Sequence, residues 1–229
     1  MFKWIVIGLA ALIAIAVGSW WYEQHRTESA LLAQPVYSVL KQHDRSLYDD
    51  LLARYRLLLR EEESRDRFVN FVNAEISKSA TNALTRASQE SVLALVRDMV
   101  STATKLQASP GDGCFQFWFP NIAGPPDVAH VIDADSQSKT LGLMAEVIRS
   151  AAENPAPPPD TEKVKDNLAS IVNAVYAEYG ADAQMLAHAE DPRIDRSRVC
   201  TITISLYERI LQLPPADASD LIRTMAPAG

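Results

Sequence analysis

Residues 20–109 contain no glycine and a single proline, Pro35. Because glycine and proline mark most tight turns, a chain that lacks them over such a length has few places to reverse except between helices. Apolar residues here recur every three or four positions, as Val92, Val96 and Met99 do, which is the spacing of one helix face. The sequence therefore predicts an all-α fold.

Helix ends can be placed from side chains that cap them. Asp44, Ser88 and Asp160 each precede a periodic apolar segment and are predicted N-caps, and we expect Asp135 to cap a further helix within an acidic segment. Gly180 is the predicted end of the helix that begins after Asp160. The core-facing stripe expected for that helix is Val164, Leu168, Ile171, Val175 and Tyr179.

Residues 23–229 are predicted to form one helical domain outside the membrane. The composition of residues 109–135 changes to glycine, proline and aromatic residues, so we expect an irregular aromatic loop there. The body is then either a single core or two packed halves, 23–108 and 136–229, joined by this loop. One segment, 200–204, alternates Thr and Ile and fits either a helix or a strand, although the wider apolar spacing favours a helix.

Residues 1–22 are predicted to form a membrane anchor, with a transmembrane helix over about 4–22. These 19 residues carry no charge, and as a helix they would reach about 28 Å, close to the ~30 Å hydrocarbon core. Trp4 at one end and Trp20 and Trp21 at the other suit the two membrane interfaces.

A cleaved signal peptide is the alternative interpretation, because the small residues Ala16 and Gly18 resemble a cleavage site. The length of the apolar run and the bulky Trp20–Trp21 pair favour an uncleaved anchor. Lys3 precedes the run, and Arg26 is the first Lys or Arg after it. The positive-inside rule then predicts a single-pass protein of a bacterial inner membrane with its body in the periplasm.

The chain has two cysteines, Cys114 and Cys200. The periplasm is oxidising, so the predicted location makes them candidates for one disulfide. Two buried free thiols are the alternative.

Four aromatic residues, Phe115, Phe117, Trp118 and Phe119, fall within five positions directly after Cys114. If their rings face solvent, they form a candidate partner contact, because exposed apolar patches often mark interaction sites. If they face inward, they fill the core between the two halves. The sequence leaves both interpretations open.

No local motif indicates catalysis, a cofactor or a metal. The chain has no phosphate loop, nucleophile elbow, zinc-protease motif or dinucleotide fingerprint. Asp127, His130, Asp133 and Asp135 form the one mixed histidine and carboxylate cluster, and a calcium loop starting at Asp133 would need glycine where Ser138 stands. We therefore predict no catalytic residue, no cofactor and no bound metal.

The formal net charge is −7, which argues against nucleic acid as a partner because phosphate binding needs clustered Lys and Arg. We expect a non-enzymatic module that binds another protein, and the acidic balance suits a basic one. An immunity-type protein that neutralises a toxin, or a subunit of an envelope assembly, would fit. The alternative is an envelope hydrolase whose site is not visible as a local motif.

Overall fold

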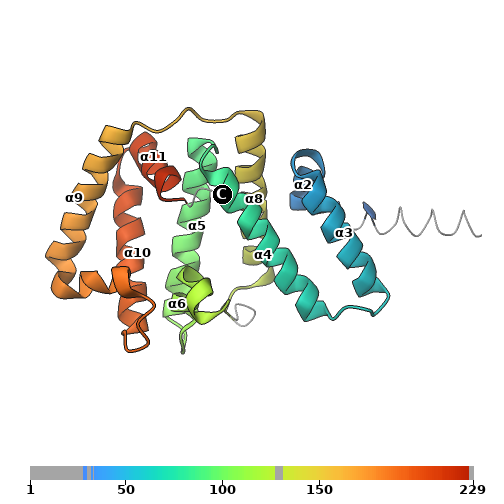
Figure 1. The fold of residues 1–229 in the computed structure, drawn as a ribbon, viewed down its shortest axis with the longest axis horizontal. Helices are drawn as coiled ribbons and strands as arrows, with labels where there is room; N and C mark the ends of the chain where they lie inside the picture. The colour runs from blue at the N-terminus through green and yellow to red at the C-terminus, as the bar shows by residue number, and fades with distance from the viewer. Residues whose placement is uncertain (1–27, 30–31, 33, 127–130, 227–229) are drawn as a thin grey trace, which may run out of the picture. The chain divides into compact units, whose positions relative to one another are not determined.

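The computed structural model describes residues 28–29, 32, 34–126 and 131–226 (Figure 1). These residues form helices and connecting loops without a strand, so the all-α prediction is confirmed. The helices are α2 (Pro35–His43), α3 (Arg45–Leu59), α4 (Arg65–Leu84), α5 (Gln89–Gln107), α6 (Gly113–Trp118), α7 (Pro120–Ala123), α8 (Ala134–Glu153), α9 (Thr161–Tyr179), the 3₁₀ helix η1 (Gly180–His188), α10 (Arg196–Gln212) and α11 (Pro215–Met225).

The predicted membrane span, residues 4–22, lies outside the described residues. Among the helices that the structure does describe, none combines the length and the apolar character needed to cross a bilayer.

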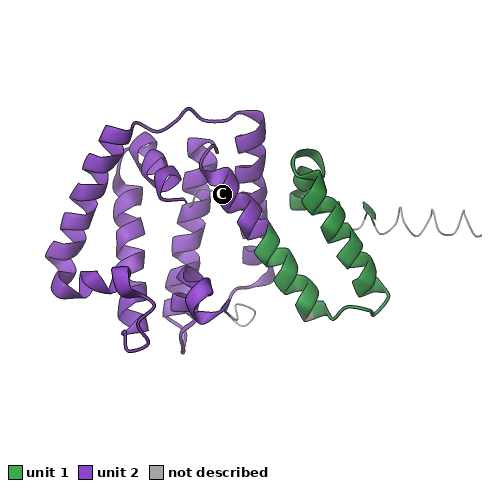
Figure 2. Cartoon of the chain, viewed as in Figure 1, with its two compact units in different colours: residues 1–75 green, residues 76–229 purple. Residues whose placement is uncertain are grey.

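The chain divides into two compact units, Met1–Glu75 and Ile76–Gly229, with the boundary inside α4 (Figure 2). This division differs from the predicted halves 23–108 and 136–229. Helix α5 precedes the 109–135 segment, yet it packs against α8, α10 and α11, which follow it. That segment therefore lies within one unit and does not separate two.

In the first unit, α2 packs against α3. The Asp44 side chain accepts a hydrogen bond from the backbone N–H of Leu47 at 3.2 Å, which confirms it as the N-cap of α3. Tyr48 is fully buried, and its hydroxyl donates to Glu28 Oε1 at 3.2 Å. Burial, followed by the neighbouring Glu28 carboxylate, raises the pKa of Tyr48 to about 12.

In the second unit, α5 packs against α6, α8, α10 and α11. Ser88 caps it as predicted, because its side chain accepts from the N–H of Ser91 at 3.3 Å. Eight of its side chains are buried, and they fall on more than one face of the helix. They are Ser91, Val92, Leu93, Leu95, Val96, Val100, Ala103 and Leu106.

Two further helix ends match the prediction, and one does not. Asp160 caps α9 by accepting from two backbone N–H groups, and Gly180 ends α9 with a φ of 57°. The N-cap of α8 is Asp133, whose side chain accepts from Ser136 N–H at 2.8 Å, so the prediction of Asp135 is wrong. Asp135 instead lies in the first turn of α8, where a carboxylate suits the helix dipole.

Residues 200–204 are helical and belong to α10. The β-branched side chain of Ile202 is fully buried, and tertiary packing of this kind overrides a local strand preference. The hydroxyl of Thr203 donates to the carbonyl of Val199 at 2.8 Å, so it is satisfied within the helix.

The expected aromatic loop, 109–135, contains two short helices, α6 and α7, which corrects the prediction that this segment is irregular. Phe119 N–H donates to the carbonyl of Phe115 at 2.9 Å, and Pro120 then starts α7 with a backbone that needs no N–H partner. Helices this short show no apolar periodicity, which is why the sequence did not reveal them.

A disulfide joins Cys114 of α6 to Cys200 of α10, as predicted, with their Cα atoms 6.0 Å apart. Both residues are buried, with 4% and 1% exposure. The bond fixes the short helix α6 to one of the helices that cover α5.

Replacing either cysteine by serine should therefore destabilise the protein strongly. The bond links residues 86 positions apart, and chain entropy alone gives about 4–5 kcal/mol for a loop of this size. Equilibrium denaturation of Cys114→Ser, Cys200→Ser and the double variant should show equal losses in all three. A double variant that loses clearly more than either single variant would contradict the pairing.

Candidate functional site

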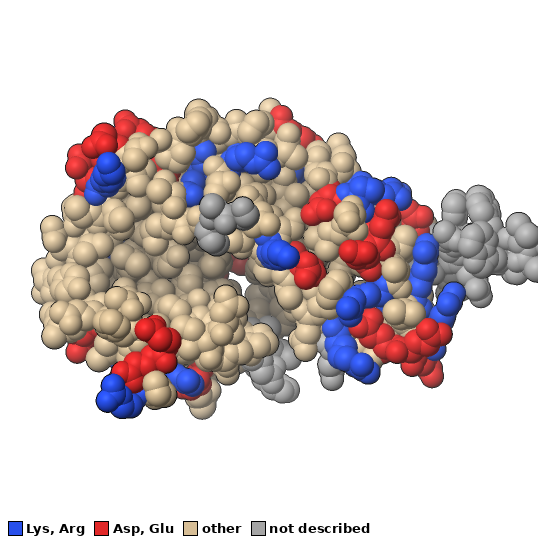
Figure 3. All heavy atoms as spheres, viewed as in Figure 1, with Lys and Arg blue, Asp and Glu red and all other residues tan. Residues whose placement is uncertain are grey.

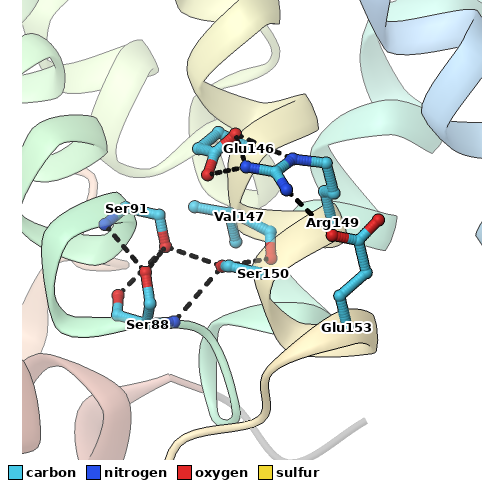
Figure 4. A network of polar contacts seen from close by, with 7 residues as sticks. All are labelled: Ser88, Ser91, Glu146, Val147, Arg149, Ser150 and Glu153. Carbon is cyan, nitrogen blue, oxygen red and sulfur yellow. Dashed lines mark hydrogen bonds and ion pairs between the residues drawn. The ribbon is translucent and has the colours of Figure 1, made fainter.

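A cluster of three serines, two of them buried, joins α5 to α8 (Figure 4). Ser91 and Ser150 are 2% and 6% exposed, and their hydroxyl oxygens lie 2.8 Å apart. The backbone N–H of Ser88 donates to Ser150 Oγ at 3.2 Å, and the Ser88 hydroxyl donates to Ser91 Oγ at 3.0 Å.

A nucleophilic serine needs a base within hydrogen-bond reach. The hydrogen bonds drawn in Figure 4 fall into two separate sets. The first set joins the three serines to one another and to the carbonyl of Val147. The second set pairs Arg149 with Glu146 and Glu153 on the half-exposed side of α8. The three serines therefore link α5 to α8 by hydrogen bonds. Their arrangement supplies no activated nucleophile.

The four aromatic residues of the candidate partner contact occupy α6 and the residue after it. Phe115 is 1% exposed and forms a core cluster with Ala189 and Val199. Phe119 stacks on Phe115 with ring centroids 4.9 Å apart. Phe115 thus lies in the interior of the second unit, and the partly buried Phe119 packs against it.

The other two rings are partly buried. Trp118 stacks on Tyr207 of α10, with centroids 4.7 Å apart and planes 6° apart, and Phe117 meets Trp118 edge-on at 5.4 Å. Burial raises the pKa of Tyr207. Phe117, Trp118 and Phe119 keep partial exposure, so their role as a partner contact stays a prediction.

Two members of the histidine and carboxylate cluster, Asp127 and His130, lie outside the described residues. Asp133 is used as a helix cap, and its hydrogen bonds from Ser136 lower its pKa. Asp135 is exposed at the start of α8. In the part of the chain that the structure describes, no three metal-binding side chains converge.

A depression of about 450 Å³, wide open to solvent, lies beside η1. Asp191 and Arg193 form an ion pair at 2.8 Å on its wall. Hydrogen bonds from Arg193 lower the pKa of Asp191 to about 2. His188, Gln184 and Met185 complete much of the wall. The pairing of Asp191 with Arg193 already satisfies the two charges, and nothing encloses a ligand.

Helix α9 presents an exposed apolar stripe. Leu168, Val172 and Tyr176 follow one another at intervals of four residues, and they are 37%, 37% and 44% exposed. Residues four apart are neighbours on a helix surface, so the three side chains are contiguous. We call them the α9 stripe.

The helix segment that carries the α9 stripe is uncharged. Residues 167–177 include no Asp, Glu, Lys or Arg. Figure 3 shows the corresponding uncharged area over the middle of α9, with charged side chains toward its two ends. A solvated helix face normally carries charge, and contiguous exposed apolar side chains mark interaction sites. The α9 stripe is therefore the candidate functional site.

The sequence prediction placed Leu168 in the core-facing stripe of α9, and the structure corrects this. Val164, Ile171 and Val175 are buried, whereas Leu168 turns outward with Val172 and Tyr176. The sequence does contain a signal for this surface. Helix α9 carries more apolar positions than the three that are buried, and residues 167–177 include no charged side chain.

Comparison of the chain with family models, curated proteins and solved structures found no match. The candidate site therefore has to be interpreted from its own geometry.

Removal of the Ser150 hydroxyl should destabilise the second unit. The Ser150→Ala variant leaves the Ser88 N–H and the buried Ser91 hydroxyl without this partner, which costs about 1–3 kcal/mol. Urea denaturation should show this loss, whereas Ser170→Ala on the exposed side of α9 should change stability little. Equal effects of the two substitutions would contradict the assignment.

The Asp191–Arg193 pair should make stability depend on pH at acidic values. The folded-state pKa of Asp191, about 2, lies below the unfolded value of about 4. The pair's contribution is therefore full above about pH 4 and is lost as the pH falls toward about 2.

The Asp191→Asn variant should lack this acid-dependent loss, and the neighbouring Glu190→Gln variant, which keeps the pair, should retain it. Denaturation series at several pH values give the comparison. Parallel pH curves for the native protein and Asp191→Asn would contradict the prediction.

Proposed function

We propose that this chain is a non-catalytic protein-binding module, held in a bacterial inner membrane by residues 4–22, with its body in the periplasm. The observation that carries the proposal is the α9 stripe, an exposed apolar surface on a folded unit. Burial of a Leu, Val or Tyr side chain in a contact is favourable, at about 25 cal/mol per Å² of apolar area. A partner that covers the stripe would gain this free energy.

The anchor and the disulfide support the proposed location together. The uncharged run at 4–22 has the length of a membrane span. A disulfide between Cys114 and Cys200 is stable in an oxidising compartment and is rare in a reducing one. A periplasmic body satisfies both observations.

Between the two kinds of binding module, the stripe favours a subunit of an envelope assembly. A protein that neutralises a basic toxin would be expected to use acidic side chains at its contact. The α9 stripe is uncharged over residues 167–177, so it suits an apolar surface on the partner. The acidic balance of the chain would then lie outside this contact.

Site-specific photo-crosslinking in intact cells tests the proposal. A photoreactive amino acid replaces Val172 in the full chain, and the matched control replaces Ser170. Ser170 is also exposed on α9, but it is turned by about 200° from Val172 around the helix axis. We expect a discrete protein adduct from position 172 only. No adduct, or the same adducts from both positions, would overturn the proposal.

A further inference from the structure

We propose that the α9 stripe binds a second copy of this chain, with the two α9 helices packed antiparallel about a twofold axis at Val172. This inference rests on the proposed function and names the partner of the same surface.

The spacing of residues along α9 is symmetric about Val172. Lys165, Leu168, Val172, Tyr176 and Tyr179 follow at intervals of three, four, four and three. In an antiparallel twofold contact each residue meets its mirror position on the other copy. Leu168 then meets Tyr176 of the second copy twice, and the two Val172 side chains meet each other on the axis.

The charges of the chain favour this surface for self-association. With a net charge of −7, two copies repel each other over most of their surface, and like charges placed opposite each other cost free energy. Residues 167–177 are uncharged, so two copies can meet there without such a pair.

A small side chain beside the stripe permits close approach of two helices. Ala169 is exposed on the same side of α9 as Tyr176, which follows it after about two helix turns. Packed helices lie about 8–10 Å apart, depending on the side chains between them. A short neighbour therefore lets the larger Leu168 and Tyr176 interdigitate.

The size of the contact predicts a weak dimer. The 15 residues from Lys165 to Tyr179 span roughly 21 Å of helix, so two such helices bury less than the ~1,200 Å² of a standard interface. Attachment of both copies to one membrane raises their effective concentration. The dimer should therefore form best in the membrane-held full chain.

Cysteine cross-linking of the full chain in its membrane tests the arrangement. Val172→Cys places a thiol on the axis, whereas the control Ser170→Cys places one on the same helix away from it. The native cysteines are buried and paired, so they do not interfere. Mild oxidation should yield a covalent dimer from Val172→Cys and not from Ser170→Cys. No dimer, or equal yields, would overturn the inference.

Charge exchange tests the antiparallel register. In the Val172→Cys background, Leu168→Glu or Tyr176→Lys alone should lower the yield of dimer roughly tenfold, because an unpaired charge is held against an apolar side chain. Together they should restore the yield, since only an antiparallel pair brings the two new charges opposite each other. Failure of the double substitution to restore the yield, in variants that keep their thermal unfolding temperature, would overturn the register.

The two proposals can fail separately. If position 172 photo-crosslinks a different protein and the cysteine variant gives no dimer, the stripe is a contact surface and the self-association is refuted. If neither experiment gives an adduct at 172, both proposals are refuted.

Discussion

The burial of α5 is the constraint on which the second unit depends. This helix packs against α6, α8, α10 and α11, and its buried side chains lie on several faces. The hydrogen bond between Ser91 and Ser150 links α5 to α8, which packs against it. The disulfide links α6 to α10, and both of these helices also pack against α5. Hydrophobic burial supplies most of the stabilising free energy. The serine hydrogen bonds and the disulfide fix which helices share that core.

The position of α9 follows from this arrangement. It packs chiefly against α10, α11 and η1, so it belongs to the outer layer of the unit. Val164, Ile171 and Val175 are its buried side chains. Leu168, Val172 and Tyr176 keep 37%, 37% and 44% exposure. Their exposure is the reason to propose a binding role for this helix.

Much of the fold could be predicted from the sequence because it depends on local chemistry. Asp44, Ser88 and Asp160 cap helices through their own side chains, and the two cysteines had only each other as partners. The choice of Asp133 over Asp135 depended on backbone angles that the sequence does not reveal. Likewise, the α9 stripe could be separated from the core stripe only when the neighbours of α9 were known, because both stripes have helical spacing.

Amide hydrogen exchange of the full chain at increasing protein concentration tests the central claim most directly. The packing around α5 should give its amides the slowest exchange at every concentration, because they open only with global unfolding. The amides of α9 should become more protected as concentration rises, since a second copy covers the stripe. Exchange in α9 that does not change with concentration, or α5 amides that exchange faster than those of α9, would contradict the account.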